Sequence, residues 1–516
     1  MTSTRTQLVF AASALGGGLL VVATPPFDAY PTLWLGMAVL AFVLGEDPGW
    51  PPLPSRGRVA LTGARRGLFF GAAANLAALR FIPDVIARFT PLPWAAGVLA
   101  LALLAVFEGS RWMVAAIACE TLARARVPRA LAFAAGVYAG TFAPTMLPWT
   151  VAGVVSPWPA MVQLADVCGE RGVSFLMALG AGLAASGVRL ALAPSTRARG
   201  ALAMAAALLL VTAQASLGVA RMRGVAASRA AAPTIRVALL NPGIGAATRW
   251  EQARAPAIAA ELEALTARAE ARGADLVVWP EAAYPYRIPH GSREEPRDAP
   301  SILGGGARGP VITGVILTLP DGSATNSAVL ATAGGLSASY DKRHLLWFGE
   351  TVPLADRLPW IRSAFARGLG LTPGAHAESL AVGRVRAAAL ICYEDILSEA
   401  GREAMALRPN LLVNLTNDAW FGGAESELHL RLAALRAVEL RRDLVRAVNL
   451  GVSSWVDATG RVRARGSPGL AAVVTAQPAL VQSPETLFAR FGDAPWALLA
   501  LVLANAAVWR ASRRSP

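Results

Sequence analysis

Three residues of this sequence carry reactive side chains at positions where folded proteins commonly place catalytic groups. Glu281 follows the apolar run Leu276–Trp279, which has the composition of a buried strand and is ended by Pro280. Cys392 follows a second apolar run, Ala387–Ile391, and precedes an expected helix. Open α/β folds place their active groups beyond the carboxyl ends of strands. A carboxylate and a thiol at such ends could serve as a general base and a nucleophile.

Lys342 is the third candidate, because it is the single lysine beside 47 arginines in a chain of 516 residues. It lies in the polar segment Tyr340-Asp341-Lys342-Arg343-His344. An arginine is always charged and fork-shaped, whereas a lysine presents a compact ammonium whose pKa can shift. A chain that otherwise uses arginine would keep a lysine where a guanidinium cannot replace it. Chance survival of one lysine codon is the alternative explanation.

Glu281 and Cys392 also have structural explanations. Taken alone, Glu281 is compatible with a solvated loop acid, and a single cysteine is commonly a small buried hydrophobe. The expected helix Ile396–Leu407 would place Cys392 near a helix N-terminus, which favours the thiolate. Cys119 and Cys168 lie in or near long apolar runs, so we assign both to packing. The three cysteines and four histidines lack metal-binding spacing, so neither a zinc site nor a disulfide framework is predicted.

The elements that would position these residues lie between about Thr234 and Gln482, where short β-branched runs alternate with amphipathic helices. This alternation predicts one α/β domain, residues 233–482, with its own core. The expected strands are Ile235–Leu240, Asp275–Trp279, Val311–Leu317, Ala387–Ile391, Leu411–Thr416 and Val445–Asn449, and the expected helices are Pro256–Arg272 and Glu425–Arg442.

Long apolar runs flank this domain, in keeping with the 54% hydrophobic composition. A helix needs about 20 apolar residues to cross a bilayer, so the shorter runs must be extended by their flanks. The runs predict a multi-pass α-helical membrane bundle of about eight spans, made by residues 1–222 and a C-terminal helix at 494–512. They are Leu8–Ala23, Leu33–Leu44, Gly67–Phe81, Leu92–Ala118, Ala130–Ala143, Val173–Leu192, Ala201–Val219 and Trp496–Trp509.

Charged residues orient these spans. With a cytoplasmic N-terminus, the inner segments carry fourteen arginines, whereas the outer loops up to the seventh span carry only Arg88 and Arg171. This asymmetry fits the positive-inside rule and predicts that both termini are cytoplasmic and the α/β domain lies outside the cytoplasm. The net charge of +14 could also suggest nucleic acid, but no zinc finger, RNA-recognition signature or helical basic run supports such a partner.

The segments around the three candidates resemble the nitrilase (carbon–nitrogen hydrolase) superfamily. They share its order of Glu281, Lys342 and Cys392 and its motifs Trp-Pro-Glu, Tyr-x-Lys-Arg-His-Leu, Phe-Gly-Glu and Cys-Tyr-Glu. Membrane helices before and after such a domain are similar to the apolipoprotein N-acyltransferase family, whose Ser-Asn-Asp-Ala-Trp-Phe-Gly is close to Thr416–Gly422. The resemblance covers nearly the whole chain. It implies a four-layered α-β-β-α sandwich domain and a Glu-Lys-Cys triad.

This chain departs from the family's motifs at several positions. None of them touches the triad, so they bear on lipid or acceptor preference rather than on the reaction. The departures are Trp347, Thr416, Arg441, Asp443 and Leu450, together with the absence from Leu131–Tyr138 of the Glu-x-x-Arg pair usual in the fifth span.

The resemblance implies a two-step acyl transfer, the last step of lipoprotein maturation, at the bacterial inner membrane with the catalytic domain on the periplasmic side. Cys392 would take an sn-1 acyl chain from a phospholipid as a thioester and pass it to the α-amine of a diacylglyceryl-apolipoprotein. Glu281 would be the general base and Lys342 the oxyanion donor. Supporting or substrate-binding roles are implied for Trp250, Asn326, Glu350, Tyr393, Glu394, Asn417 and Trp420. The implied partners are the two substrates and membrane lipid, with no metal or organic cofactor.

Two other functions remain compatible with the sequence. A membrane-anchored nitrilase-type amidase would use the same triad to hydrolyse a small amide. A transporter with an external domain would carry paired ionisable residues inside its spans. Arg80 and Arg111 are the candidates for such pairs, but both could snorkel near helix ends, and Glu108 is the one acidic neighbour.

Overall fold

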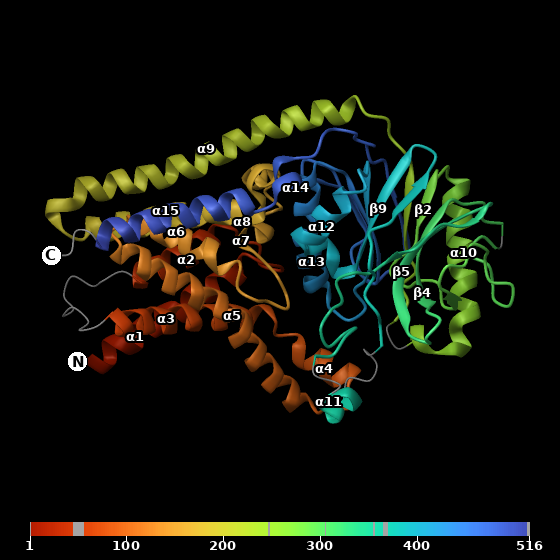
Figure 1. The fold of residues 1–516 in the computed structure, drawn as a ribbon, viewed down its shortest axis with the longest axis horizontal. Coiled ribbons are helices and arrows are strands. Elements are labelled where there is room, and N and C mark those ends of the chain that lie inside the picture. Colours follow the sequence, from red (N-terminus) through yellow and green to blue (C-terminus); the bar gives the residue numbers. More distant parts are fainter. Residues whose placement is uncertain are drawn as a thin grey trace. The chain divides into compact units, whose positions relative to one another are not determined.

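The computed structural model describes residues 2–44, 56–245, 248–304, 306–353, 357–364 and 370–512. The chain divides into two compact units (Figure 1). The first comprises Met1–Arg88, Leu92–Ala220 and Phe491–Pro516, and the second comprises Phe89–Pro91 and Arg221–Arg490.

The first unit is helical, and each of the eight predicted apolar runs coincides with a helix. Its helices are α1 (Thr2–Val22), α2 (Pro31–Leu44), α3 (Arg56–Ala78), α4 (Ile82–Phe89), α5 (Trp94–Arg124), α6 (Arg129–Gly140), α7 (Val151–Val154), α8 (Ala165–Ala191), α9 (Arg197–Ala230) and α15 (Ala494–Ser512). In the described part of the chain, three helices are long and apolar enough to cross a membrane, namely α5, α8 and the stretch Pro194–Ala230. The number rises to four if α3 and α4, which are bent by 53°, form one span.

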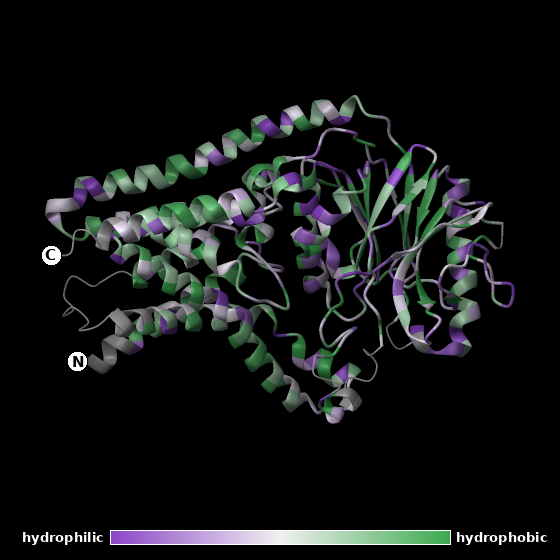
Figure 2. Cartoon of the chain, in the orientation of Figure 1, coloured by the Kyte–Doolittle hydropathy of each residue, from purple (hydrophilic) through white to green (hydrophobic). Residues whose placement is uncertain are grey.

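Close helix packing and an apolar exterior characterise this unit. A Cβ atom at Gly67 would lie 2.2 Å from Trp112 O, and one at Gly136 would lie 2.3 Å from Ala115 O, so α3 and α6 approach α5 backbone to backbone. Small residues at helix contacts are typical of membrane bundles. Large apolar side chains such as Leu103 (64% exposed) face outward, and Figure 2 shows these helices as predominantly hydrophobic.

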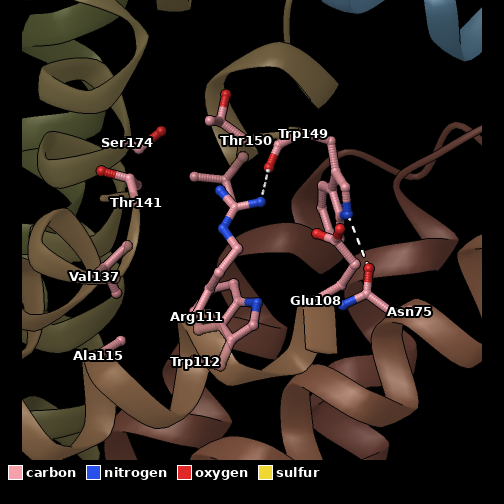
Figure 3. Close-up of a pocket in the computed structure, with 12 residues that line it drawn as sticks. Asn75, Glu108, Arg111, Trp112, Ala115, Val137, Thr141, Trp149, Thr150 and Ser174 are labelled. Carbon is pink, nitrogen blue, oxygen red and sulfur yellow. Dashed lines mark hydrogen bonds between the residues drawn. The ribbon is translucent and has the colours of Figure 1, made fainter. Parts of the chain in front are cut away.

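A polar cluster lies inside this apolar unit at the middle of α5 (Figure 3). Glu108 accepts hydrogen bonds from Thr145–Leu147, in the non-helical segment between α6 and α7. Arg111 Nη1 donates to Trp149 O (3.0 Å), and Trp149 Nε1 donates to Asn75 Oδ1 (3.0 Å). Arg111 therefore lies well inside α5 rather than near its end, and its guanidinium binds a backbone carbonyl of the same unit. The Glu-x-x-Arg spacing absent from α6 occurs here in α5.

The second unit contains two β-sheets. The first sheet has the order β14-β1-β2-β4-β5-β6, with β3 beside β4 and β7 beside β5; the second has the order β13-β12-β11-β10-β9-β8. The strands of the first sheet are β1 (Val237–Asn241), β2 (Leu276–Val278), β3 (Arg287–Pro289), β4 (Val311–Thr318), β5 (Ala324–Thr332), β6 (Gly335–Leu336), β7 (Tyr340–Asp341) and β14 (Ala472–Ala476). Those of the second are β8 (Ser379–Val382), β9 (Val385–Ile391), β10 (Leu411–Asn417), β11 (Leu444–Asn449), β12 (Ser454–Val456) and β13 (Val462–Arg465).

Alternating side chains divide the core of this unit into layers. Val237 and Leu239 of β1 belong to the cluster between the two sheets, whereas Ala238 and Leu240 belong to the cluster under α10 (Ala255–Ala271). This follows from the two-residue period of a strand. The second sheet contacts α12 (Ser398–Met405) and α13 (Gly423–Leu440) (Figure 1). The predicted α/β domain is confirmed, and its layers run α-β-β-α.

The predicted strands match β1, β2, β4, β9, β10 and β11 with ends that differ by no more than two residues. The predicted helix Ile396–Leu407 matches α12 (Ser398–Met405) within the same two residues at each end. Before it, Cys392–Ile396 forms a short 3-10 turn, η6.

Candidate active site

Strand ends bring the three sequence candidates to one region. In the first sheet β1, β2 and β4 run parallel, and in the second β9, β10 and β11 run parallel. Glu281 lies three residues beyond β2, and Cys392 directly follows β9. Lys342 follows β7, and its backbone N–H donates to Asn326 O of β5 (2.8 Å).

Lys342 lies between two carboxylates. Its Nζ is 2.7 Å from Glu350 Oε2 and 3.5 Å from Glu281 Oε1. The Asn326 amide donates to both acids, at 2.8 Å to Glu281 Oε1 and at 2.9 Å to Glu350 Oε1. Because the lysine side chain is only 1% exposed, water has little access to these contacts. One ammonium and one amide thereby hold both carboxylates in a fixed arrangement.

Backbone N–H groups hold the same acids from other sides. Asn417 N–H donates to Glu281 Oε2 and Leu346 N–H donates to Glu350 Oε2, both at 3.0 Å. A third acid, Glu394, is fully buried and ties the segment after Lys342 to the turn that carries Cys392. Its carboxylate accepts from the N–H groups of Ile391, Arg343 and His344 and from the Tyr340 hydroxyl.

Cys392 occupies a strained turn. Its φ of 52° lies in the left-handed region, which costs a non-glycine residue roughly 1–2 kcal/mol. Asn414 of β10 holds the turn, since its Nδ2 donates to Leu390 O and to Cys392 O, each at 3.1 Å. Thr416 Oγ1 donates to Asn414 Oδ1 (2.6 Å) and so fixes the orientation of that amide.

Backbone strain also accompanies the two acids. Ala282, directly after Glu281, has a φ of 42°, and Phe348, two residues before Glu350, has a φ of 62°. A Cβ atom at Gly314 of β4 would lie 2.2 Å from Ala282 N, so only glycine lets the Glu281 turn pack there. Strained residues cluster at functional sites, which supports this region as the active site.

Burial and neighbouring charges set the protonation of the site. Burial raises the pKa of Glu281; Lys342 opposes that rise and Glu350 adds to it. Burial alone would lower the pKa of Lys342, but Glu350 and Glu281 raise it well above its ordinary value. For Glu350, burial would raise the pKa, but Lys342 brings it below the ordinary value. The resting site therefore holds a Lys342–Glu350 ion pair beside a carboxylate with raised proton affinity.

The expectation that a helix N-terminus favours a Cys392 thiolate is wrong. The residue opens a short 3-10 turn, and α12 begins only at Ser398, so Cys392 is not at the N-terminus of an α-helix. Burial raises the pKa of the thiol well above its usual value; the charge of Glu281 adds to this rise, and that of Lys342 opposes it. A thiolate therefore needs a base that removes its proton.

The three aromatic residues implied by the resemblance, Tyr393, Trp420 and Trp250, differ in their surroundings. Tyr393 is half-buried, with its ring centroid 6.0 Å from Lys342 Nζ. Trp420 is half-buried, and its ring lies 4.2 Å from that of Phe89, which belongs to the same unit. The backbone of Trp250 ends the 3-10 turn η3 (Thr248–Trp250), but its side chain lies outside the described residues.

Sequence reasoning missed two residues of the site. Asn414 could have been found, because it is an amide within the apolar stretch Leu411–Leu415 of a strand. Arg249 carries no such signal among 47 arginines. Burial lowers its pKa to about 10, and the charge of Glu281 opposes this shift, so a guanidinium also acts on the acid. Within the described ranges, no group of three or more His, Cys, Asp or Glu residues could hold a metal ion.

Comparison with known families defines the class of protein. Residues 236–483 match the carbon-nitrogen hydrolase family, so the second unit is a nitrilase-like α/β domain. Residues 16–183 match the apolipoprotein N-acyltransferase N-terminal domain. Among solved structures, a double mutant of the amidase from Nesterenkonia sp. AN1 in complex with acrylamide is 21% identical, with a TM-score of 0.38 over 52% of this chain and 97% of that chain.

Relatives of similar length define the particular family. The apolipoprotein N-acyltransferase of Geobacter metallireducens is 31% identical over 508 residues, which cover 95% of this chain and 92% of the relative. That of Bradyrhizobium diazoefficiens is 31% identical over 533 residues, which cover 97% and 95%. The chain belongs to the apolipoprotein N-acyltransferase family.

Proposed function

We propose that this chain transfers an acyl chain from a phospholipid to an apolipoprotein through a thioester on Cys392. The observation that carries the proposal is the buried Glu281–Lys342–Glu350 cluster beside the strained Cys392 turn. It is supported by the similarity to N-acyltransferases, which extends over the helical unit as well as the α/β unit.

The first step forms the thioester. Glu281 takes the thiol proton as the sulfur of Cys392 attacks the carbonyl carbon of the sn-1 ester. The tetrahedral intermediate collapses with cleavage of the ester C–O bond, and Glu281 returns the proton to the departing glyceryl oxygen. The products are an acyl-enzyme and a lysophospholipid. The raised pKa of Glu281 suits a group that must hold a proton between these two transfers.

The second step forms the amide. The α-amine of S-diacylglyceryl cysteine attacks the thioester carbonyl, Glu281 takes a proton from the attacking nitrogen, and the C–S bond breaks. The released sulfur regains its proton from Glu281. A thioester suits this role, because an amine attacks it readily once water is kept from the site.

Lys342 stabilises the oxyanion in both steps, together with the backbone N–H of Tyr393. Glu350 keeps the ammonium charged and aimed, because their 2.7 Å ion pair is buried. Asn326 orients both acids, Asn417 anchors the general base, and Glu394 fixes the nucleophile turn. Tyr393 and Trp420 line the lipid entrance.

The membrane arrangement is part of the same proposal. Residues 1–222 and 494–512 form eight spans, residues 233–482 form the catalytic domain on the periplasmic side of the inner membrane, and both termini are cytoplasmic. The support is the arginine asymmetry together with eight helices that coincide with the apolar runs. Alkaline phosphatase fused after Arg221 should be active, whereas the same reporter fused after the last residue should be inactive. The opposite pattern would reverse the topology.

The proposed reaction is tested by trapping the intermediate. Purified protein incubated with phospholipid should gain one acyl mass on the peptide that contains Cys392, and a diacylglyceryl lipopeptide should then remove it as an amide. Cys392→Ser should abolish both events, and Cys119→Ala and Cys168→Ala should preserve them. Acyl mass on Cys119 or Cys168 instead would overturn the assignment of the nucleophile.

Hydrolysis of a small amide is the nearest alternative, because the carbon-nitrogen hydrolase domain is compatible with it. It has less support, since the relatives that match along the whole chain are N-acyltransferases. Ammonia release from small amides, measured beside lipopeptide acylation on the same preparation, separates the two reactions.

Transport is a second alternative, favoured by the buried Glu108 and the half-buried Arg111 inside the helical unit. These side chains bind the backbone of their own unit, however, and the cavity beside them measures about 30 Å³, which suits one or two water molecules. Cys392→Ala should leave a transporter active and an acyltransferase inactive.

A further inference from the structure

A second cluster of buried charges adjoins the nucleophile turn. His429 of α13 lies between two carboxylates, with Nε2 2.9 Å from Asp395 Oδ1 and Nδ1 3.1 Å from Asp418 Oδ1. The imidazole is 9% exposed, and both carboxylates are fully buried. Each ring nitrogen faces an acceptor, so both contacts are hydrogen bonds only when both nitrogens carry a proton.

The charges of this cluster balance only if the imidazole is protonated. Asp395 Oδ2 also accepts from Arg446 Nε (2.8 Å), and Asp418 Oδ2 accepts from the Ser426 hydroxyl. Two carboxylates therefore face one guanidinium and one imidazole. Burial alone would lower the pKa of His429, but Asp395 and Asp418 raise it to about 9. At neutral pH the ring is an imidazolium.

The two carboxylates belong to the two turns on which the proposed reaction depends. Asp395 lies in η6, three residues after Cys392. Asp418 directly follows Asn417, whose backbone N–H holds Glu281 Oε2. One imidazolium on α13 therefore connects the turn of the nucleophile to the turn that anchors the general base.

One carboxylate of this cluster, Asp418, also acts on the sulfur. Burial raises the pKa of the Cys392 thiol; the charges of Glu281, Glu350 and Asp418 add to this rise, and that of Lys342 opposes it. An imidazolium bound to Asp418 offsets the negative charge of that carboxylate. A neutral side chain in its place would leave the Asp395–Asp418 pair with one uncompensated charge, which would make the thiolate harder to form.

We propose that His429 is a positioning residue that, as an imidazolium, ties the nucleophile turn to the base-anchoring turn and offsets their carboxylates beside Cys392. The inference rests on the proposed function for the identity of the reaction, but its physical claim concerns the reactivity of one thiol. A histidine that only filled space would give the same packing without any dependence on charge.

The test measures that reactivity without any lipid. In a Cys119→Ala/Cys168→Ala background, the alkylation rate of Cys392 by iodoacetamide is recorded against pH. We expect His429→Gln to shift the profile upward by about one pKa unit, which lowers the rate about tenfold at a given pH below the pKa. His429→Lys, which keeps a cation, should stay within about threefold of the parent protein. The matched control is His376→Gln, at an exposed histidine of the same unit, which should leave the profile unchanged.

A second variant keeps the inference testable even if His429→Gln does not fold. The double variant His429→Gln/Asp418→Asn has lost one positive and one negative charge, so the cluster is neutral again. It should fold and recover most of the parent alkylation rate. The inference is overturned if folded His429→Gln reacts like the parent, if His429→Lys is as slow as His429→Gln, or if the double variant is unfolded or unreactive. Failure of the acyl transfer itself would appear separately, as absence of acyl mass on the parent protein.

Discussion

Replacing Lys342 by arginine separates the need for a positive charge from the need for an ammonium. The lysine Nζ reaches Glu350 at 2.7 Å and Glu281 at 3.5 Å in a site where the side chain is 1% exposed. A guanidinium is larger and planar and binds a carboxylate side-on. Arginine would keep the ion pair with Glu350 but would displace Glu281 and could not aim a single N–H at the oxyanion.

The size of the effect follows from two losses in one site. Removal of one oxyanion donor costs roughly 10²–10³-fold in rate, and displacement of a reacting group by about 1 Å costs about 10²-fold. Such losses are not additive when the groups act as a unit. We therefore expect Lys342→Arg to slow acylation about a thousandfold, equivalent to about 4 kcal/mol in the barrier. Lys342→Met is less informative, because removal of the cation that contacts both buried carboxylates would cost roughly 3–5 kcal/mol of stability.

The assay is the single-turnover appearance of acyl mass on the Cys392 peptide. The matched control is Arg343→Lys at the next position, where Nη1 lies 2.7 Å from Glu403 Oε2 and both side chains are about one-quarter exposed or more. That exchange should change the rate by no more than about twofold, because an exposed ion pair contributes little. If folded Lys342→Arg acylates at more than about a tenth of the wild-type rate, the charge alone suffices and the oxyanion role is refuted.

Three further predictions test the backbone and the second charge cluster. In Gly314→Ala, the new Cβ 2.2 Å from Ala282 N would displace the Glu281 turn and slow acylation about a hundredfold, whereas Gly334→Ala, with its nearest atom at 3.6 Å, should not. Cys392→Gly and Cys392→Ala both lack the nucleophile. Because the φ of residue 392 is 52°, the glycine variant should be about 1 kcal/mol more stable than the alanine variant and should unfold at a higher midpoint. Equal midpoints would contradict the strain. His429, with a pKa raised to about 9, should contribute about 3 kcal/mol of stability that is fully present below about pH 6.5 and lost as the pH rises through 9. The stability difference between wild type and His429→Asn should shrink over that range, and a flat difference would contradict the imidazolium.

Apolar patterning predicted the inner strands β1, β2, β4, β9, β10 and β11, because strands buried on both faces have few polar residues. Strand β5 was not predicted, because it does not follow this apolar pattern. Its residues Thr325, Asn326 and Ser327 are polar but buried, and they find partners from distant segments or from one another. Thr325 Oγ1 and Ser327 Oγ lie 2.8 Å apart, and Ser327 Oγ donates to Asp341 Oδ1. A sequence pattern cannot show that such polar groups will find hydrogen-bond partners, so the sequence of β5 resembles that of a loop.

The candidate site could be predicted as a set of residue types but not as an arrangement of charges. Residue order and strand ends indicated Glu281, Lys342 and Cys392. The sequence could not show that Lys342 is closer to Glu350 than to Glu281, because that difference depends on how the segment after β7 turns back on itself. Nor could it show the raised pKa of the thiol, which depends on burial and on acids far away in the sequence.

The unequal distances from Lys342 assign different tasks to the two acids. Glu350, at 2.7 Å, has its pKa lowered by the lysine and stays charged, whereas Glu281, at 3.5 Å, has a pKa raised by burial and by Glu350. Neighbouring groups whose pKa values are pushed apart commonly divide into a permanent charge and a proton carrier.

Glu350→Gln tests this division of labour. The substitution removes the negative charge that raises the pKa of Glu281 and leaves Lys342 to pair with Glu281 alone, so both changes lower the pKa of the base. A weaker base should slow acylation, and the acidic limb of the pH–rate profile should move to lower pH. Glu281→Gln should instead abolish acylation at every pH. An acidic limb that stays in place or moves upward in Glu350→Gln would mean that Glu281 is not the group that takes the thiol proton.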